Sequence, residues 1–136
     1  MRDPLKSSPG YSLRRASNAM MAELGGRLNP LDLRMADASV LVLIGANPGI
    51  TASKIGRALD IQRANMVPLL KRLEDAGLVS RAPIDGKSQG LSLTEAGTAR
   101  VAEVRGVIDS FEADLLARVP EAHREHLLPA LDALWR

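Results

Sequence analysis

The stretch that decides the fold is QRANMVPLLKRLEDAGLV, residues 62–79. Its apolar residues recur at the three- and four-residue spacing of a single helix face: Met66, Leu69, Leu70 and Leu73. Pro68 stands inside this pattern, where it removes an N–H and presses on the carbonyl of Ala64, a defect worth up to ~3 kcal/mol in a regular helix. The segment therefore predicts a helix that tolerates a proline, and the position of that proline needs an explanation.

Two apolar stripes upstream have helical spacing. They predict helices over Tyr11–Leu28 and Leu33–Ala46, stopped by Asn29-Pro30 and by Asn47-Pro48-Gly49 respectively. Thr51 is a good N-cap for a short third helix that carries Ile55 and Leu59. Asp60 then fills the turn before the opening segment, because Asp tolerates a left-handed backbone. The first nine residues are predicted to be a flexible tail.

A hairpin is predicted after the opening helix, which Gly77 caps at its C-terminus. The two strand candidates, Leu78–Ile84 and Leu91–Leu93, flank the turn residues 85–90. Thr94 then caps a long helix, and Pro120 opens a last one.

Two helices, a turn of about three residues and a two-stranded hairpin predict a winged helix-turn-helix. The fold class is therefore mainly α (α+β), with a two-stranded wing and with N- and C-terminal dimerisation helices. Residues 10–136 form one domain, in which 31–93 are the winged-helix lobe, and 10–30 and 94–136 are the dimerisation helices. We expect the apolar seams of these terminal helices to pair with a second subunit, because little of the domain remains to cover them. The residues assigned to this contact are Leu13, Val104, Ile108, Phe111, Leu127, Leu131 and Trp135.

The composition narrows the function classes. The chain has 136 residues, is 46% hydrophobic and contains no cysteine, which excludes disulfides, thiol redox sensing and cysteine-rich zinc sites. The N-terminal MRDPLKSSPG lacks the apolar run of a signal peptide, and the most apolar run, 38–46, is too short to span a bilayer. We therefore expect a cytoplasmic protein without membrane contact. Lys and Arg outnumber Asp and Glu by seven to four in residues 50–90, which favours an anionic partner, although a chance fluctuation on a solvated surface explains the excess equally well.

The opening helix is expected to enter the major groove of DNA with its outer, N-terminal part. Steps of 100° per residue from Met66 place Ala64, Pro68 and Lys71 outward, flanked by Asn65 and Val67. Pro68 either contacts a thymine methyl and re-aims its neighbours, or it is a tolerated kink. Arg63 suits guanine and Asn65 suits adenine, with a phosphate clamp and a local capping bond as the respective alternatives.

Phosphate contacts are expected from two further places. Thr51, Ser53 and Lys54 lie at a helix N-terminus, where hydroxyls, charge and free N–H groups meet. Backbone contacts are also assigned to Lys71 and, on the hairpin, to Arg81, Lys87 and Gln89. Arg72 is expected to form a structural ion pair, and Asp85 to be a turn residue or the partner of a wing arginine.

The chain resembles the MarR (multiple antibiotic resistance regulator) family of bacterial transcription factors. The matching residues are ITASKIGRALDIQRANMVPLLKRLEDAGLV (50–79), an Asp-led wing at Asp85, and LSLTEAG (91–97). The resemblance covers about residues 10–136. It implies a homodimer that binds a palindromic double-stranded DNA operator, and repression relieved by a small aromatic or phenolic effector.

Two departures from the family pattern bear on the site. Family wings usually carry two arginines after the aspartate, where this chain has Gly86 and Lys87; lysine neutralises phosphate but lacks the planar fork of arginine. Ala38 replaces a common aromatic residue. The resemblance implies a ligand between the lobe and the dimer helices, and the small residues Ala38, Gly25 and Gly26 leave room for an effector site there.

Two rival functions remain. A winged-helix protein-interaction module would not need the basic residues of the helix and wing. A metal-dependent enzyme would use His123 and His126, which share a face with Glu121 and Glu125, although structural sites usually need four ligands with supporting contacts. The chain has no recognisable catalytic motif and no phosphate-cradling loop, so we expect no enzyme, no metal and no cofactor.

Overall fold

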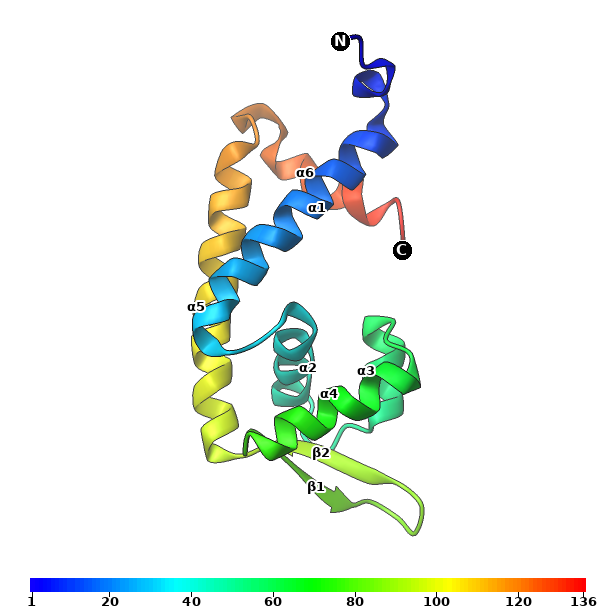
Figure 1. Ribbon diagram of the computed structural model, residues 1–136, viewed down its shortest axis with the longest axis vertical. Coiled ribbons are helices and arrows are strands. Elements are labelled where there is room, and N and C mark those ends of the chain that lie inside the picture. Colours follow the sequence, from blue (N-terminus) through cyan, green and yellow to red (C-terminus); the bar gives the residue numbers. More distant parts are fainter.

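The computed structural model describes residues 1–136 as an elongated molecule with two ends (Figure 1). The lobe at one end contains α2, α3, α4 and the β1–β2 hairpin, and α5 runs along one side from this lobe to the other end, where α1 and α6 meet it. The helices are α1 (Pro9–Leu28), α2 (Met35–Ala46), α3 (Ala52–Leu59), α4 (Arg63–Asp75), α5 (Glu95–Arg118) and α6 (Arg124–Asp132). Short 3₁₀ turns cover Pro4–Ser7, Asn29–Leu31 and Glu121–His123. None of the helices combines the length and the apolarity needed to cross a bilayer.

The predicted capping and turn residues are confirmed by their geometry, although α2 begins at Met35 and not at the predicted Leu33. The Thr51 hydroxyl oxygen accepts the Lys54 N–H at 3.3 Å, and the Thr94 hydroxyl oxygen accepts the Gly97 N–H at 3.0 Å. Asp60 and Gly77 adopt the left-handed backbone expected of them, with φ of 53° and 75°. Local residue choice therefore sets these boundaries.

The hairpin is a wing with a third, short attachment. Strands β1 (Val79–Pro83) and β2 (Gln89–Leu93) pair antiparallel, with Val79 opposite Leu93 and Pro83 opposite Gln89. The loop before α3 also pairs with β2, because the Gly49 N–H donates to the Leu91 carbonyl and the Leu91 N–H to the Ile50 carbonyl, both at 2.8 Å. This contact ties the wing to the start of α3.

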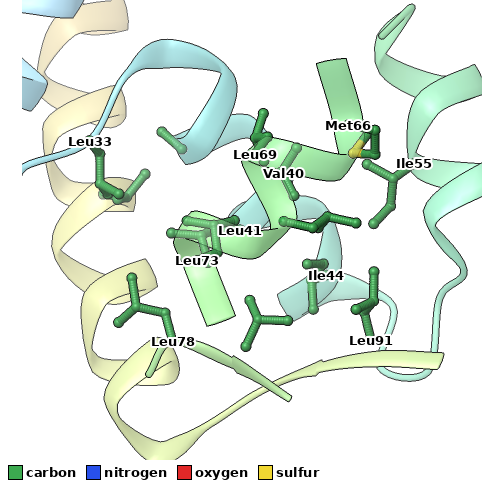
Figure 2. Packing of buried hydrophobic residues seen from close by; sticks show 14 of the residues in the cluster. Leu33, Val40, Leu41, Ile44, Ile55, Met66, Leu69, Leu73, Leu78 and Leu91 are labelled. Atoms are coloured by element: carbon green, nitrogen blue, oxygen red, sulfur yellow. The ribbon is translucent and has the colours of Figure 1, made fainter. Parts of the chain in front are cut away.

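The core of the lobe is built from aliphatic side chains of every element (Figure 2). Met66, Leu69, Leu70 and Leu73 of α4 are all buried in it, as the sequence predicts. They pack with residues from the linker before α2, from α2 and α3, and from the wing and the turn before it. These residues include Leu33, Val40, Leu41, Ile44, Ile55, Leu78 and Leu91.

The start of α5 is pressed against the end of the lobe. The Thr94 hydroxyl donates to the Gly77 carbonyl at 2.6 Å, and a Cβ added at Gly97 would overlap the backbone of Leu78. A residue larger than glycine does not fit at position 97 without moving one of these backbones. The first turn of α5 is thus part of the lobe, while its C-terminal half belongs to the other end of the molecule.

The predicted apolar seam of α5 is largely covered inside the protomer, which corrects one expectation. Val104 and Phe111 are fully buried, and Ile108 is half-buried against the core cluster. The reason is that α5 packs across both α2 and α1, so its stripe faces its own chain. Val104 and Phe111 are therefore core residues of the single chain.

Both ends of the chain differ in detail from their prediction. The stretch expected to be a flexible tail contains the 3₁₀ turn Pro4–Ser7, with the Asp3 carboxylate accepting the Leu5 N–H at 3.0 Å. The last helix begins at Arg124, after the 3₁₀ turn that follows Pro120, and it ends at Asp132. Trp135, which was assigned to a helical stripe, therefore lies beyond the helix and is 72% exposed.

Candidate nucleic-acid interface

A wide groove lies between α3, the N-terminal half of α4 and the wing. Its volume is about 1060 Å³. It brings together residues from the two helices of the helix-turn-helix and from both sides of the wing turn. The lining residues are Thr51, Ala52, Ser53, Gly56, Arg57, Asp60, Ile61, Arg63, Met66, Val67, Leu70, Arg81, Pro83, Asp85, Gly86, Lys87, Ser88 and Gln89.

Positive charge predominates along this groove. Arg57, Arg63, Arg81 and Lys87 line it. Arg57, Arg63 and Lys87 are exposed, and no carboxylate lies within ion-pair distance of them. These three cations are free to meet an anionic backbone.

Arg57 was missed by reasoning from the sequence. It lies two residues after Ile55, which is fully buried, so a step of about 200° points it away from the core. The same step places Ser53 on that outer side, and Lys54 is exposed beside it. The helical position relative to Ile55 was the signal that would have identified Arg57.

The outer face of α4 is mixed in character. Arg63, Ala64, Asn65, Val67 and Pro68 are all exposed, as predicted. The helix is unbroken from Arg63 to Asp75 despite Pro68, and Gln62 at its N-cap makes no side-chain capping bond. The proline thus sits on the solvent side, where its ring does not disturb the packing of the core.

Two of the predicted phosphate contacts are engaged inside the protomer. Lys71 Nζ lies 3.0 Å from Asp75 Oδ2, and the Arg81 guanidinium forms an ion pair with Glu74. Exposed pairs of this kind are weak, so the cations can exchange partners, but each carries a carboxylate beside it. Arg81 therefore adds less positive charge to the groove than Arg57, Arg63 or Lys87, and Lys71 does not line the groove.

The wing turn is shaped by Asp85, which confirms its expected role as a turn residue. Its carboxylate accepts the backbone N–H of Lys87 at 2.8 Å and that of Ser88 at 2.7 Å. These two bonds hold the pKa of the Asp85 carboxyl below its usual value. The turn projects the exposed side chain of Lys87, and Gln89 follows as the first residue of β2.

Arg72 forms the predicted structural ion pair, and its partner is Asp37 of α2. Arg72 Nη2 lies 2.8 Å from Asp37 Oδ1, and Asp37 Oδ2 accepts the Arg34 N–H at 3.0 Å. Asp37 is the buried charged residue of the lobe, with only 5% of its surface exposed. The pair fixes α4 against the N-terminus of α2.

A second charge cluster joins α1 to α5 far from the groove. The Glu23 carboxylate accepts from Arg118 at 2.6 and 2.8 Å and from Arg27 at 3.0 Å, and Arg27 also contacts Asp114 at 2.8 Å. Hydrogen bonds from Arg118, and then those from Arg27, lower the pKa of Glu23 to about 2. This cluster holds the crossing of the two long helices.

The residues predicted for an effector site are not brought together in a cavity of the single chain. Ala38 is buried in the lobe core, whereas a Cβ at Gly25 or Gly26 would meet no atom within 4 Å. A cavity of about 430 Å³ instead lies at the junction beside Asp37, one residue from Ala38. Its lining residues are Asn29, Asp32, Leu33, Arg34, Asp37, Arg72, Leu73, Ala76, Leu78 and Arg100.

The histidines lie on exposed surface near the last helix. His126 Nε2 is 3.2 Å from Glu125 Oε1, and His123 ends the preceding 3₁₀ turn. The structure contains no group of three or more His, Cys, Asp or Glu side chains arranged to hold a metal ion.

Comparison with known proteins places these features in a family. The sequence profile of the MarR family matches residues 33–87. The chain is 31% identical to the transcriptional repressor CouR, solved with a 23-mer DNA duplex, with a TM-score of 0.88 and complete coverage of both chains. CouR bound to p-coumaroyl-CoA gives 31% identity and a TM-score of 0.87, covering 100% of this chain and 97% of that one. The HTH-type transcriptional repressor Rv2887 of Mycobacterium tuberculosis is 28% identical over 127 residues, which are 92% of this chain and 91% of the relative.

Proposed function

The chain belongs to the MarR family of DNA-binding transcription regulators, and we propose that it is a homodimeric repressor that leaves its palindromic operator when an acidic aromatic ligand binds. The observation that carries the DNA contact is the groove formed by α3, α4 and the wing. It unites an exposed helix face with the free cations Arg57, Arg63 and Lys87. Cations on α3, α4 and the wing suit the phosphate backbones, and the exposed N-terminal half of α4 suits the major groove.

Subunit pairing is supported by exposed apolar side chains at the end of the molecule opposite the lobe. Leu13, Leu116, Leu128, Leu134 and Trp135 are between 40% and 72% exposed, and all of them lie on α1, the end of α5, or α6 and its following turn. Such residues favour burial in a large, apolar interface of the obligate kind. Leu127 and Leu131, both half-buried, extend this surface along α6.

The junction cavity is the best-placed site for an effector. Arg34, Arg72 and Arg100 line it, and Arg72 forms its ion pair with Asp37 there. Guanidinium groups bind carboxylates and phosphates with planar, paired hydrogen bonds. An acid that draws Arg72 away from Asp37 releases the contact that holds α4, and it thereby shifts the protein towards a lobe arrangement that misfits DNA. The relative CouR has been solved with p-coumaroyl-CoA, which unites an aromatic group with acidic phosphates.

The test is enrichment of binding sites from randomised DNA, followed by titration of the enriched duplex and a scrambled duplex. We expect one palindromic motif, bound by two protomers, and an Arg63→Ala variant that loses most of its preference for the motif. Titrating p-coumaroyl-CoA, with free CoA as the control, should release the operator. Failure to enrich any sequence would contradict operator binding and would favour a winged-helix protein-interaction module.

A further inference from the structure

We propose that α4 reads thymine methyl groups through an apolar strip formed by Ala64, Val67 and Pro68, so that thymines dominate the bases facing this strip in each operator half-site. The inference rests on the DNA contact proposed above and specifies what that contact recognises.

The strip lies on the solvent-exposed face of α4, away from the core. Positions 64, 67 and 68 have the spacing i, i+3, i+4, which places them on neighbouring parts of one helix surface. The core stripe of α4 is formed separately by Met66, Leu69, Leu70 and Leu73. The protomer therefore leaves a second apolar stripe of α4 in solvent.

Val67 is the most informative member. It is 60% exposed, although valine is among the residues most often buried, and it lines the groove opposite the wing turn. More than half of its surface is open to solvent, and the groove that it lines also carries the free cations Arg57, Arg63 and Lys87. The groove therefore suits an occupant that carries negative charge and has an apolar group to set against Val67.

Duplex DNA meets this description through one chemical group. The C5 methyl of thymine is the apolar group that base pairs present in the major groove, whereas cytosine presents an N4 amino group and guanine O6 and N7 acceptors. A valine placed against an amino group or a carbonyl oxygen would bury it without a hydrogen bond, which is costly. The strip thus favours thymine and penalises G·C pairs at the same positions.

The flanking polar residues extend this preference. Asn65 lies beside the strip and suits adenine, the partner of thymine, while Arg63 at the start of the helix suits guanine. The ring of Pro68 offers a rigid apolar surface and no N–H, so it makes no competing hydrogen bond. Together these residues predict A·T pairs beneath the strip, with a G·C pair towards the helix start.

Thymine methyls are tested by replacing thymine with deoxyuridine, which removes the methyl and keeps the base pair. The experiment uses the full chain and the duplex enriched from randomised DNA, with one deoxyuridine at a time. We expect two or more positions per half-site at which the affinity for DNA falls about fourfold, which is the effect of losing the burial of one methyl-sized group. Deoxyuridine outside the half-sites is the control and should have no effect.

Variants connect the lost methyl to a side chain. Val67→Ala removes two methyl groups from the exposed strip and leaves the core residues of α4 unchanged. It should reduce the ratio of the affinities for thymine and deoxyuridine duplexes at one position from about four to near one. Ile84→Ala is the matched control, because Ile84 is similarly exposed (56%) and β-branched but lies at the end of the wing. It should leave the ratio unchanged.

The outcomes separate this inference from the proposed function. Operator binding with equal affinity for thymine and deoxyuridine at every position would overturn the strip while leaving the regulator intact. Sensitivity to deoxyuridine that persists in Val67→Ala and disappears in Ile84→Ala would also overturn it, because the wing would then be the reader. Failure of the chain to enrich any DNA would overturn both.

Discussion

Arg72 of α4 donates to Asp37 of α2, with 2.8 Å between Nη2 and Oδ1, and Asp37 is buried while nearly half of Arg72 is exposed. The carboxylate also accepts the N–H of Arg34 at the start of α2. One buried group therefore caps one helix and anchors another, and the arginine that completes it also lines the junction cavity.

Replacing Arg72 by Ala should destabilise the protein by ~1–3 kcal/mol, because the buried Asp37 carboxylate loses its charged partner. Operator affinity should fall as well, since α4 loses its anchor to α2. Lys71→Ala is the matched control: its pair with Asp75 is exposed on both sides, so its removal should change stability by less than ~1 kcal/mol. Urea unfolding of both variants measures this, and an Arg72 variant as stable as the control would contradict the anchoring role.

Binding to any duplex should weaken steeply with salt, with a slope near −0.9 for each phosphate neutralised. Lys87→Ala should weaken operator and scrambled DNA similarly and make the slope shallower by about 0.9, because its exposed ammonium is held by no carboxylate. Arg57→Ala should do the same. A change in sequence preference would instead show that the residue contacts bases. Titrations from low to high salt distinguish the two results.

Replacing Pro68 by Ala restores an N–H for the Ala64 carbonyl inside α4. Thermal stability should rise by ~1 kcal/mol, with ~3 kcal/mol as the upper bound. Operator affinity should fall roughly tenfold because the first turn no longer presents Arg63 and Asn65 in the same way, while scrambled DNA should bind as before. An alanine variant that binds the operator as tightly as the parent would mean that the proline is a tolerated kink.

A folded monomer should not persist at micromolar concentration, because Leu128, Leu134 and Trp135 would be left in solvent. Sedimentation of the parent should give a single dimeric species. A variant with Leu128→Ser and Trp135→Ser should dissociate, whereas Val67→Ser, a change of a similarly exposed side chain in the lobe, should not. Dimers that survive the double substitution would place the interface elsewhere.

The Glu23 cluster predicts an acid-dependent contribution to stability. The pKa of Glu23 is lowered from 4.5 to about 2 in the folded protein, chiefly by Arg118, so its stabilisation is complete above pH 4.5 and is lost as the pH falls to about 2. Glu23→Gln should therefore be less stable than the parent at neutral pH, with the difference shrinking across this range. Glu112→Gln, on α5 but outside the cluster, should have the same stability as the parent at each pH. Chemical unfolding at several pH values decides it.

The features that sequence reasoning predicted are those set by neighbouring residues. The core face of α4 follows from a stripe of four apolar residues between Met66 and Leu73, and the turns at Asp60 and Gly77 follow from the backbone preferences of single residues. The Arg72 pair was also expected, although its partner was not, because Asp37 is 35 positions away.

The features that were missed depend on how distant helices cross. The stripe of Val104 and Phe111 has the same spacing whether it faces a second subunit or its own chain, and only the crossing of α1 and α2 over α5 decides between them. The pair of Arg81 with Glu74 likewise depends on the wing folding back on α4. Whether Gly25, Gly26 and Ala38 border a ligand depends on a partner subunit that one sequence does not describe.

The continuous course of α5 has a mechanical consequence. Its 24 residues give a rod of ~36 Å that is fused to the lobe at Gly97 and clamped to α1 at Arg118. A tilt of about 5° at the clamped end swings the other end through roughly 3 Å, which is close to the 3.4 Å rise of one base step. Misalignment of the two lobes by one base step thus requires only a slight change of angle between subunits.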